Sequence, residues 1–526
     1  MDTKALKQKI LDLAIRGKLV PQDPNDEPAS VLLEKIRAEK QQMVNDGRLK
    51  SKDLKNDTVI FVGEDNLHYE KFCDGTVKCI QKKIPFEIPD NWAWTRFRNI
   101  IVNDKGGGTP DKSNPKYWGG SIQWMSVKDF SGAKNGVIVD TIDHVTQEGV
   151  NNSSTNIIDT SAIILCTRMG LGKYAKLAHP TAINQDLRAI WLSKNIHENY
   201  FLAFYSTLNI DGNGTTVEGI KKEQLLNTLI PIPPFKEQAR IANIQKTGFS
   251  EIEIIENQKI ALCELINNTK SKILDLAIRG KLVSQDPNDE PASALLERIR
   301  HEKEELIKVG KLKRDKRESV IFRGEDNSYY ETIGNKKACI DSEIHYDIPE
   351  GWTVERLKNL YSVNPKNDIA NDETIVSFVP MNLINDQFLY NCTYELKQWK
   401  DCKKGFTHFA DGDLGFAKIS PCFENRKSVV FSNLKNGYGA GTTELYILRN
   451  FCEGLNPKYT ILFLKSESFI ERGVDTYSGT VGQQRIDKNI MMDTIIPIPP
   501  QNEQQRIADR VKQLFSILDS IQATIV

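Results

Sequence analysis

Residues 229–244 read LIPIPPFKEQARIANI, and residues 270–306 read KSKILDLAIRGKLVSQDPNDEPASALLERIRHEKEEL. Each piece occurs a second time. Residues 495–511, IIPIPPQNEQQRIADRV, repeat the first piece, and residues 7–43, KQKILDLAIRGKLVPQDPNDEPASVLLEKIRAEKQQM, repeat the second. Internal repeats set an architecture before any local pattern does. The central stretch is therefore the complete repeat unit. The C-terminal segment repeats its first half, and the N-terminal segment repeats its second half.

This arrangement predicts pseudo-twofold, circularly permuted symmetry. In the aligned repeats Val526 corresponds to Ile260 and Met1 to Glu264, so that only residues 261–263 have no counterpart. If the two ends of the chain lie end to end, they rebuild a second helix of the central type. Termini of compact proteins often lie close together, so we expect this geometry to be unstrained.

Length and composition bound the class of protein. The chain has 526 residues, enough for three or four domains, and its 70 Lys and Arg balance its 70 Asp and Glu. The overall charge therefore does not indicate nucleic-acid binding, and it does not exclude local basic patches. The nine Cys form no CxxC pair, and the sequence shows no apolar leader and no apolar run of membrane-spanning length. We expect a cytoplasmic protein with reduced thiols.

Long helices dominate the repeated parts. Residues 3–18 and 30–44 are predicted to be helices, joined by the turn PQDPNDEP at 21–28. From residue 236 to about residue 281 only Gly248 interrupts a helical pattern, which at 1.5 Å per residue would span roughly 70 Å.

The helical repeats also carry the pattern of a coiled coil. Apolar residues of the C-terminal repeat follow 4-3 spacing, at Ile507, Val511, Leu514, Leu518, Ile521 and Ile525. The best partner for this seam is the other copy of the repeat, and chain connectivity makes that pairing antiparallel. In the alternative interpretation, each helix packs onto the core of its own domain.

The regions between the helices are two domains. Residues 100–230 and 360–500 are rich in short alternating runs, typical of β-rich, mixed α/β domains. Trp92 and Trp352 lie in a repeated segment ahead of each, where we interpret them as core anchors. The edges of the two domains repeat while their interiors do not, which indicates one scaffold that presents two surfaces recognising different things.

The predicted fold class is therefore α+β, with two mixed α/β domains joined by long antiparallel coiled-coil helices. The polar residues 48–83, in which FVGEDN at 61–66 recurs as FRGEDN at 322–327, are predicted to form a connector. The predicted segments are an N-terminal helical segment, a first recognition domain, a central helical region, a second recognition domain and a C-terminal helix, at 1–50, 51–234, 235–310, 311–500 and 501–526.

Catalytic motifs are absent from the sequence. GLGKY at 170–174 lacks the first Gly and the final Ser or Thr of a phosphate-binding loop. The seven His form no HExxH pattern, no Cys or His cluster has zinc spacing, and no GxSxG is present. We therefore expect a binding protein with no catalytic residue and no metal site.

The repeated motifs together carry a family likeness. They are the two PIPPxxEQxRI segments, the two ILDLAIRGKLVxQDPNDEPAS segments, GGGTP at 106–110 with YWGG at 117–120, and the stretches that begin with Gly-Thr at 214 and 479. In this combination, which frames nearly the whole chain, the sequence resembles the specificity subunit of type I restriction–modification systems, which act in DNA methylation and phage defence.

The resemblance implies a DNA-binding subunit without catalytic activity. Two target recognition domains would each read one half of a bipartite, asymmetric site on double-stranded DNA, while the helices hold the half-sites at a fixed separation. The helices would also dock two modification (methyltransferase) subunits, and restriction (translocase/nuclease) subunits would join the complete assembly. No cofactor is expected on this chain, because S-adenosylmethionine would bind the modification subunits, and ATP and Mg the restriction subunits.

DNA-contacting residues are predicted from residue type and position. Base reading needs Arg, Lys, Asn, Gln, Ser or Thr on loops that enter a groove, and phosphates need Lys, Arg or backbone N–H groups. The candidates lie next to Gly or at the ends of β-rich runs, and they are Lys105, Gly107, Thr109, Lys128, Arg168, Lys173 and Gln185 in the first domain and Lys366, Lys418, Arg426, Lys427, Gln483, Gln484 and Arg485 in the second. A hairpin turn is an equally good interpretation of the Gly106–Gly108 run.

Two other functions stay open. A coiled-coil scaffold that joins proteins without touching DNA would agree with the neutral charge, and it predicts no retention on DNA under any partner condition. An enzyme with a cryptic site in the β-rich domains would turn over a substrate when purified alone. A repeated frame around divergent domains favours DNA recognition over both.

Overall fold

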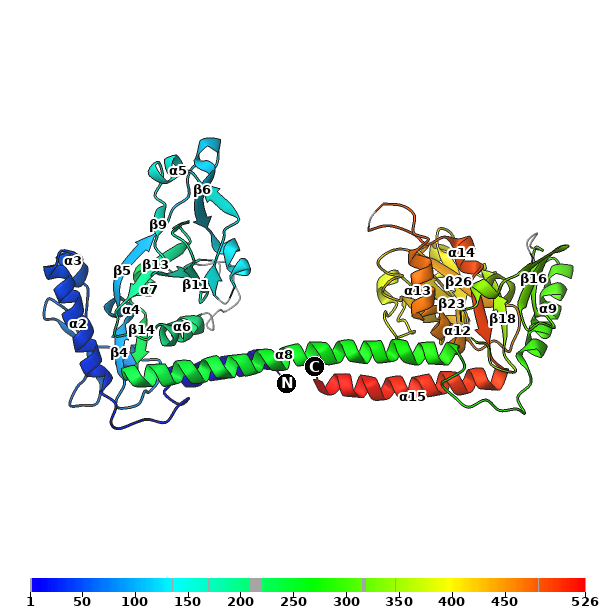
Figure 1. Cartoon of the computed structure of the whole chain (residues 1–526), viewed down its shortest axis with the longest axis horizontal. Coiled ribbons are helices and arrows are strands. Elements are labelled where there is room, and N and C mark those ends of the chain that lie inside the picture. Colours follow the sequence, from blue (N-terminus) through cyan, green and yellow to red (C-terminus); the bar gives the residue numbers. More distant parts are fainter. Residues whose placement is uncertain are drawn as a thin grey trace. The chain divides into compact units, whose positions relative to one another are not determined.

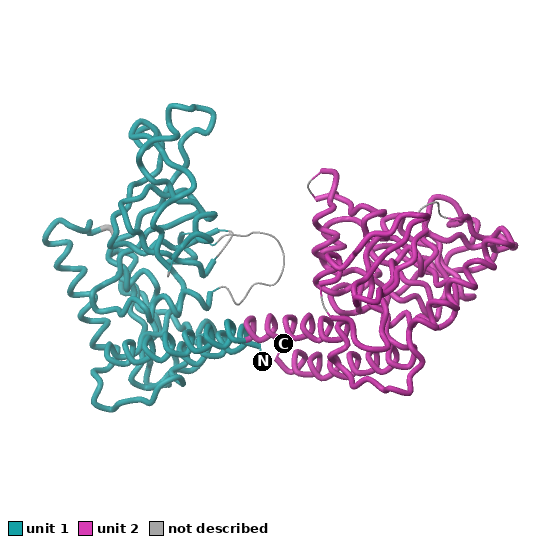
Figure 2. The backbone as a smooth tube through the Cα atoms, turned by 45° about the vertical axis from the view of Figure 1, so that its right-hand side comes forward, with its two compact units in different colours: residues 1–258 teal, residues 259–526 magenta. Residues whose placement is uncertain are grey.

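The computed structural model describes residues 2–134, 136–168, 171–208, 220, 222–314, 318–345, 347–480 and 482–525, without the side chains of residues 52 and 53. The chain divides into two compact units, unit 1 (Met1–Gln258) and unit 2 (Lys259–Val526), which are coloured separately in Figure 2. The boundary falls inside helix α8 (Phe235–Ile278), the long helix that lies between the two β-rich domains in the sequence.

In unit 1 the N-terminal helix lies along the first part of α8 (Figure 1). Helix α1 (Thr3–Ile15) places Lys7 3.1 Å from the carboxylate of Glu256. Beyond its end, Gln22 donates a hydrogen bond to Glu237 at 2.6 Å. Residue numbers rise along one helix as they fall along the other, so the predicted antiparallel pairing is confirmed within this unit.

Unit 2 repeats this pairing with the C-terminal helix. Helix α15 (Gln501–Ile525) places Asp519 2.5 Å from Lys270 of α8. Near its start, Arg506 lies 2.6 Å from Asp289, which follows the end of α8. The pairing is again antiparallel. The closure of the whole chain into a symmetric ring depends on how the two units are placed, and it stays a prediction.

The seam of α15 is shared between α8 and the domain core. Its buried apolar residues belong to the same core as Phe416, Tyr459 and Phe463 of the adjoining domain, and they are Ile507, Val511 and Phe515. Further along the helix Ile521 is exposed. The apolar face of α15 therefore packs both on α8 and on the core of its own domain. The coiled-coil interpretation and the domain-packing interpretation each hold in part.

The β-rich domain of unit 1 contains two sheets. The first has the order β5-β13-β10-β11-β7, from Ile101–Gly106, Leu187–Leu192, Ile163–Cys166, Tyr174–Leu177 and Val137–Ile138. The second has the order β8-β6-β12-β9, from Asp143–Val145, Trp118–Met125, Thr181–Ile183 and Asn156–Ile158. In the second sheet β6 and β12 run parallel, and the other pairs are antiparallel.

The domain of unit 2 has the same two sheets. One has the order β19-β26-β23-β24, from Tyr361–Val363, Leu445–Asn450, Leu414–Ala417 and Ser428–Val430. The other has the order β21-β20-β25-β22, from Glu395–Gln398, Ile375–Val379, Tyr438–Gly441 and Thr407–Ala410. The parallel pair is β20 and β25.

Strand order, direction and chain order therefore match strand for strand, with β5 corresponding to β19 and β13 to β26. Only β7 lacks a counterpart among the described strands of unit 2. The two interiors have no close sequence match, so one topology is built from two unrelated sets of core residues. Volume and polarity pattern, more than residue identity, specify a packed core.

The frame around the domains repeats as predicted. Helices α2 (Ala29–Asn45) and α9 (Ala292–Lys308) follow the Asp-Pro turns, and α6 (Glu198–Thr207) corresponds to α12 (Pro457–Leu464). Each PIPP segment forms a strand, β14 (Leu229–Ile232) or β27 (Ile495–Ile498), and pairs with the strand after the repeated Trp, β4 (Ala93–Arg96) or β18 (Thr353–Arg356). Short helices α4 (Phe97–Ile100), α10 (Leu357–Leu360), α7 (Lys222–Leu226) and α14 (Lys488–Met492) complete the frame.

The polar stretch 48–83 is more than the connector that its composition predicts. It forms a three-stranded antiparallel sheet, β1 (Val59–Val62), β2 (His68–Lys71) and β3 (Val77–Cys79). Unit 2 has the same sheet, β15 (Ser319–Arg323), β16 (Tyr329–Ile333) and β17 (Lys336–Cys339). Polarity misled the prediction because a small sheet exposes much of its surface.

The remaining short elements lie in loops of the two domains and are α3 (Ser51–Leu54), α5 (Gln147–Asn151), α11 (Trp399–Cys402), α13 (Glu467–Val474) and six 3-10 turns. The α+β class with two mixed, β-rich domains is confirmed. The five-segment division stays a prediction. No helix in the described part of the chain has the length and apolar character needed to cross a membrane.

Candidate nucleic-acid interface

In unit 1 three loops meet where β12 ends. They are the glycine run after β5, the turn after β6 and the hairpin after β10. Backbone hydrogen bonds hold them together, from Gly108 N to Ile183 O at 3.0 Å, from Asn184 N to Met125 O at 3.0 Å and from Thr167 N to Asp186 O at 2.9 Å. Loops that come from different strands thus form one surface at a single edge.

Several of the predicted residues gather on this surface. Thr109 donates a hydrogen bond to Gln185 Oε1 at 2.5 Å. Arg168, with 62% of its side chain exposed, lies 3.7 Å from Asp186. Lys105 is exposed on β5, with its ammonium 5.9 Å from the centre of the Trp191 ring. An amide, a hydroxyl and the guanidinium of Arg168 therefore lie on these converging loops, while the ammonium of Lys105 lies near Trp191 on the adjoining strand.

The glycine run itself is a packing feature. A Cβ on Gly107 would lie 2.0 Å from Ile183 O, and one on Gly108 would lie 2.1 Å from Ser154 Oγ. The backbone passes this close to its neighbours only because no side chain is present. Gly107 therefore faces protein backbone, and it lets the chain bring Thr109 to Gln185.

In unit 2 the equivalent loops meet at the end of β25. The loop after β23 and the segment 478–486 are joined by hydrogen bonds from Ser420 N to Gln484 O at 2.9 Å, from Ile486 N to Lys418 O at 3.0 Å and from Lys418 N to Glu444 O at 3.0 Å. Arg485 donates to both carboxylate oxygens of Glu444, at 2.8 and 3.0 Å. Lys418, Gln484 and Arg485 are therefore brought together.

Two acidic residues that organise these surfaces were not predicted from the sequence. Asp186 and Glu444 occupy the same place in the shared topology, one after β12 and one after β25. The carbonyl of each accepts a hydrogen bond from the residue that follows β10 or β23. Each carboxylate holds an arginine, Arg168 or Arg485. Only the strand equivalence identifies them, because the flanking sequences differ.

Three predicted residues of unit 2 lie elsewhere. Arg426 has only 11% of its side chain exposed and bonds to Ser271 of α8 and to Glu467. Lys427 donates to the carbonyl of Met381 at 3.0 Å. Lys366 is exposed in the loop after β19. The pKa of His408 is lowered mainly by burial and secondly by the positive charge of Lys366.

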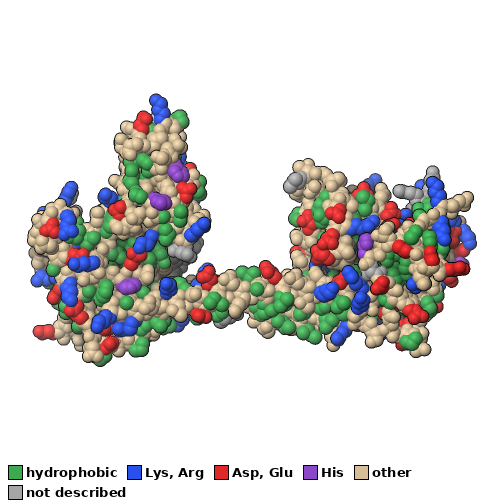
Figure 3. All heavy atoms as spheres, viewed as in Figure 1, with side chains coloured by type: hydrophobic (Ala, Val, Ile, Leu, Met, Phe, Trp, Pro, Cys, Tyr) green, Lys and Arg blue, Asp and Glu red, His purple; other side chains and the backbone are tan. Residues whose placement is uncertain are grey.

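The other predicted residues are accessible. Lys128 lies in the turn after β6, Lys173 in the hairpin after β10, and Gln483 in the segment before Arg485, and all three are exposed. Figure 3 shows that basic and acidic side chains are mixed on the face in view, in agreement with the neutral overall charge. Recognition would therefore rest on local contacts more than on a strong field.

The arginine and carboxylate side chains of this surface are bound to one another, and they form no metal-binding group in the part of the chain that the structure describes. Among the residues that the structure describes, no three His, Cys, Asp or Glu side chains are grouped so that they could hold a metal ion. The carboxylate of Glu444 has its pKa lowered, mainly by the hydrogen bonds from Arg485, so it stays ionised and bound. The surface offers donors and acceptors in fixed positions, which suits recognition.

Comparison with known proteins places the frame in a family. The family model described as "Type I restriction modification DNA specificity domain" matches residues 89–264 and 349–525. The specificity subunits of the type I restriction enzymes EcoAI and EcoEI, both from Escherichia coli, are 44% and 42% identical over 257 residues, or 49% of this chain. These alignments span 41% and 40% of the two relatives' own lengths.

A solved structure gives a further comparison. The HsdS subunit from Thermoanaerobacter tengcongensis aligns over 85% of this chain and 94% of its own, with 15% identity and a TM-score of 0.41.

Proposed function

Because the chain belongs to the family of type I restriction–modification DNA specificity domains, we propose that it is the DNA-recognition subunit of such a system. It has no catalytic role of its own in this proposal. Unit 1 reads one half of a bipartite, asymmetric site on double-stranded DNA, and unit 2 reads the other half.

One observation carries this proposal, namely the shared topology of two domains that present different residues on their converging loops. Beside Asp186 the first domain presents Gln185 and Thr109, whereas beside Glu444 the second presents Arg485 and Lys418. Different donors and acceptors read different bases. A shared scaffold with unlike contact residues therefore supports two unlike half-sites.

The proposed contact residues are those on the converging loops. In unit 1 they are Lys105, Thr109, Lys128, Arg168, Lys173 and Gln185, with Gly107 in a supporting role. In unit 2 they are Lys418, Gln483, Gln484 and Arg485. Lys366 is a proposed contact at a separate place, while Arg426 and Lys427 serve the packing of unit 2 because their side chains bond within it.

Partners follow from the same proposal. Two modification subunits, which would bind S-adenosylmethionine, would dock on the repeated frame, and restriction subunits, which would bind ATP and Mg, would join through them. The repeat of the frame in each unit supports two equivalent docking places. The proposed site of action is the cytoplasm, where the DNA lies.

Methylation-sensitive sequencing of host DNA, with and without this gene, tests the proposal. We expect the loss of one methylated motif that has two unlike halves and a fixed gap. Loss of no motif, together with purified complexes that fail to retain DNA, would favour the scaffold function, which the mixed surface charge in Figure 3 also fits.

A further inference from the structure

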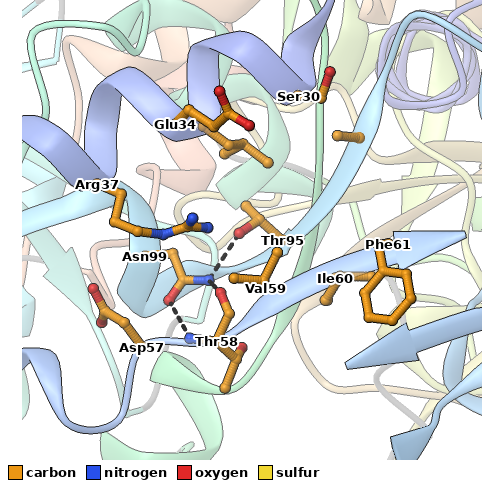
Figure 4. A pocket seen from close by; sticks show the side chains of 12 residues that line it. Ser30, Glu34, Arg37, Asp57, Thr58, Val59, Ile60, Phe61, Thr95 and Asn99 are labelled. Carbon is orange, nitrogen blue, oxygen red and sulfur yellow. Dashed lines mark hydrogen bonds between the residues drawn. The ribbon is translucent and has the colours of Figure 1, made fainter. Parts of the chain in front are cut away.

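A pocket of about 210 Å³ lies between α2 and β1 in unit 1 (Figure 4). Leu33 and Val59 give it an apolar wall. Its floor is Asn99, which donates to Thr58 O at 2.8 Å and to Thr95 Oγ1 at 2.9 Å. The exposed Arg37 extends from α2 toward this floor in the figure.

Unit 2 contains the same pocket, with a volume of about 240 Å³, between α9 and β15. Its lining repeats that of the first pocket position by position, because Leu296, Arg300, Ser319, Val320 and Asn359 stand for Leu33, Arg37, Thr58, Val59 and Asn99. The floor is again held by its asparagine, which donates to Ser319 O at 3.1 Å.

One acidic residue in each pocket is paired with a buried lysine, while Glu34 also lines the first pocket, and Glu304 and Glu355 also line the second. Asp57 lies 2.5 Å from Lys40, and Glu318 lies 3.0 Å from Lys303. The arginine on the helix is a second cation at each pocket, and in unit 1 it is exposed. In unit 2 it also lies 3.3 Å from Glu355 of the pocket wall.

An exposed aromatic face adjoins each pocket. Phe61 and Tyr69 are stacked with their ring centres 5.9 Å apart, and Phe322 and Tyr330 are stacked at 6.0 Å. Phe61 is 41% exposed and Phe322 is 39% exposed.

The repeated GEDN turn fixes this face. Tyr69 donates to Asp65 at 2.7 Å and Tyr330 to Asp326 at 2.8 Å. A Cβ on Gly63 would lie 2.8 Å from the Tyr69 ring, so the turn and the ring pack closely. A rigid aromatic pair that stays exposed costs little conformational entropy when a partner covers it.

The repetition points to the occupant. Residues that read two unlike half-sites differ between the units, whereas these pockets and faces keep the same or similar residues at most positions, Glu355 in the place of Thr95 being the main difference. Their ligand must therefore present the same chemistry twice. We propose that each pocket, with its aromatic face, docks one copy of the modification subunit, through a partner segment that inserts an apolar side chain and covers the exposed rings. This inference rests on the proposed function, which supplies the two copies.

Substitutions of the exposed rings test the docking site. Phe61→Asp and Phe322→Asp place a charge where an apolar contact is needed, without emptying a core. Mixed with the purified cognate modification subunit and measured by mass photometry, the native chain should bind two copies, each single variant one, and the double variant none at concentrations where the native chain is saturated. Val139→Asp and Val309→Asp, at residues that are 50% and 64% exposed outside the face, should still bind two.

Two exposed cysteines give an independent readout. Cys79 pairs in register with Tyr69 and Cys339 with Tyr330, so both lie on the aromatic faces. Alkylation of both thiols should slow at least fivefold in the complex with the modification subunit. Equal rates with and without that subunit would overturn the assignment.

The outcomes separate three cases. If the double variant binds two modification subunits as the native chain does, the docking assignment is wrong. If its stoichiometry is unchanged but DNA binding weakens, the face belongs to the DNA interface. If the native chain binds no modification subunit at all, the proposed function fails along with this inference.

Discussion

Arg485 donates two hydrogen bonds to the carboxylate of Glu444, at 2.8 Å from Nη2 to Oε1 and 3.0 Å from Nε to Oε2. Paired bonds of this kind fix the plane of a guanidinium. In the first domain, Arg168 from a different loop lies 3.7 Å from Asp186, the residue equivalent to Glu444. An acidic residue at the end of the central strand thus orients a cation in both domains.

Arg485→Ala should weaken DNA binding roughly tenfold at the half-site read by unit 2, because a side chain fixed in this way loses little entropy on contact with a base or phosphate. Fluorescence anisotropy with duplexes altered in one half-site measures the effect. Lys435→Ala is the control, since this exposed residue precedes β25 while Glu444 follows it. Equal weakening in both variants would contradict the prediction.

Gln185→Ala should relax base preference in the other half of the site, since the amide is the group best suited to bidentate base reading on the unit 1 surface. Thr109→Val should give a smaller effect in the same half, because it removes only the hydrogen bond that orients Gln185. Sequencing of methylated motifs from cells that carry each variant shows which half changes. A change in the half read by unit 2 would refute the assignment.

Lys465 predicts a pH dependence of stability in unit 2. The side chain is 1% exposed and donates to Gln387 O at 2.9 Å and Arg426 O at 2.5 Å. Burial, aided by Arg426, lowers its pKa to about 7. Between pH 7 and 10 the unfolded chain holds the proton that the folded chain loses, so this residue makes stability rise with pH, by at most about 1.4 kcal/mol per pH unit.

Lys465→Met should remove that rise. Urea unfolding at pH 7, 8 and 9 should show a difference between native chain and variant that grows in favour of the native chain as pH increases. Taking the difference cancels the titration of other groups. A difference that stays constant over this range would show that the ammonium of Lys465 keeps its proton in the folded state.

Gly17 and Gly280 should not tolerate alanine. They follow α1 and α8 with φ of +67° and +65°, and a Cβ would lie 2.4 Å from Pro89 Cγ or 2.5 Å from Pro349 Cγ. Gly47, with φ of +71° and open space around it, is the matched control. Gly47→Ala should cost only about 1 kcal/mol for the left-handed backbone, and Gly17→Ala or Gly280→Ala clearly more, by denaturant unfolding.

Glu503 should matter as a hydrogen-bond acceptor. Its carboxylate, 1% exposed, accepts from Trp352 Nε1 at 3.0 Å, and burial raises its pKa. Glu503→Ala would leave a buried indole N–H without a partner and should destabilise unit 2 by about 1–3 kcal/mol. Glu503→Gln keeps an acceptor and should recover most of that loss, because it also removes a buried charge. Equal losses in both variants would show that the charge is what matters.

The frame could be predicted because its signals are local. The Asp-Pro turns, the glycines that end α1 and α8 and the long apolar stripes each act within a few turns of helix. The antiparallel pairing of Lys7 with Glu256 also followed from the chain, since the repeat shows which helices are equivalent and connectivity sets their direction. The same repeat carries the family resemblance.

The interface could be predicted only in part. Thr109, Arg168 and Gln185 do lie on loops that meet, but nothing near them in sequence points to Asp186 or to the meeting of three loops. In unit 2, Arg426 is of a residue type that often contacts DNA, but its guanidinium donates a hydrogen bond to Ser271 of α8. A basic side chain beside a turn looks the same in the sequence whether it faces solvent or a neighbouring helix.

By itself the sequence determined the repeated frame, its helices and the existence of two domains with different interiors. Only the tertiary structure decided that these interiors share one topology, that Asp186 and Glu444 are equivalent, and that the polar GEDN stretches form sheets beside two matching pockets. The reason is that helices and turns are encoded by neighbours along the chain. Strand pairing joins residues far apart, through backbone groups that every residue carries, so it leaves little trace in the order of the side chains.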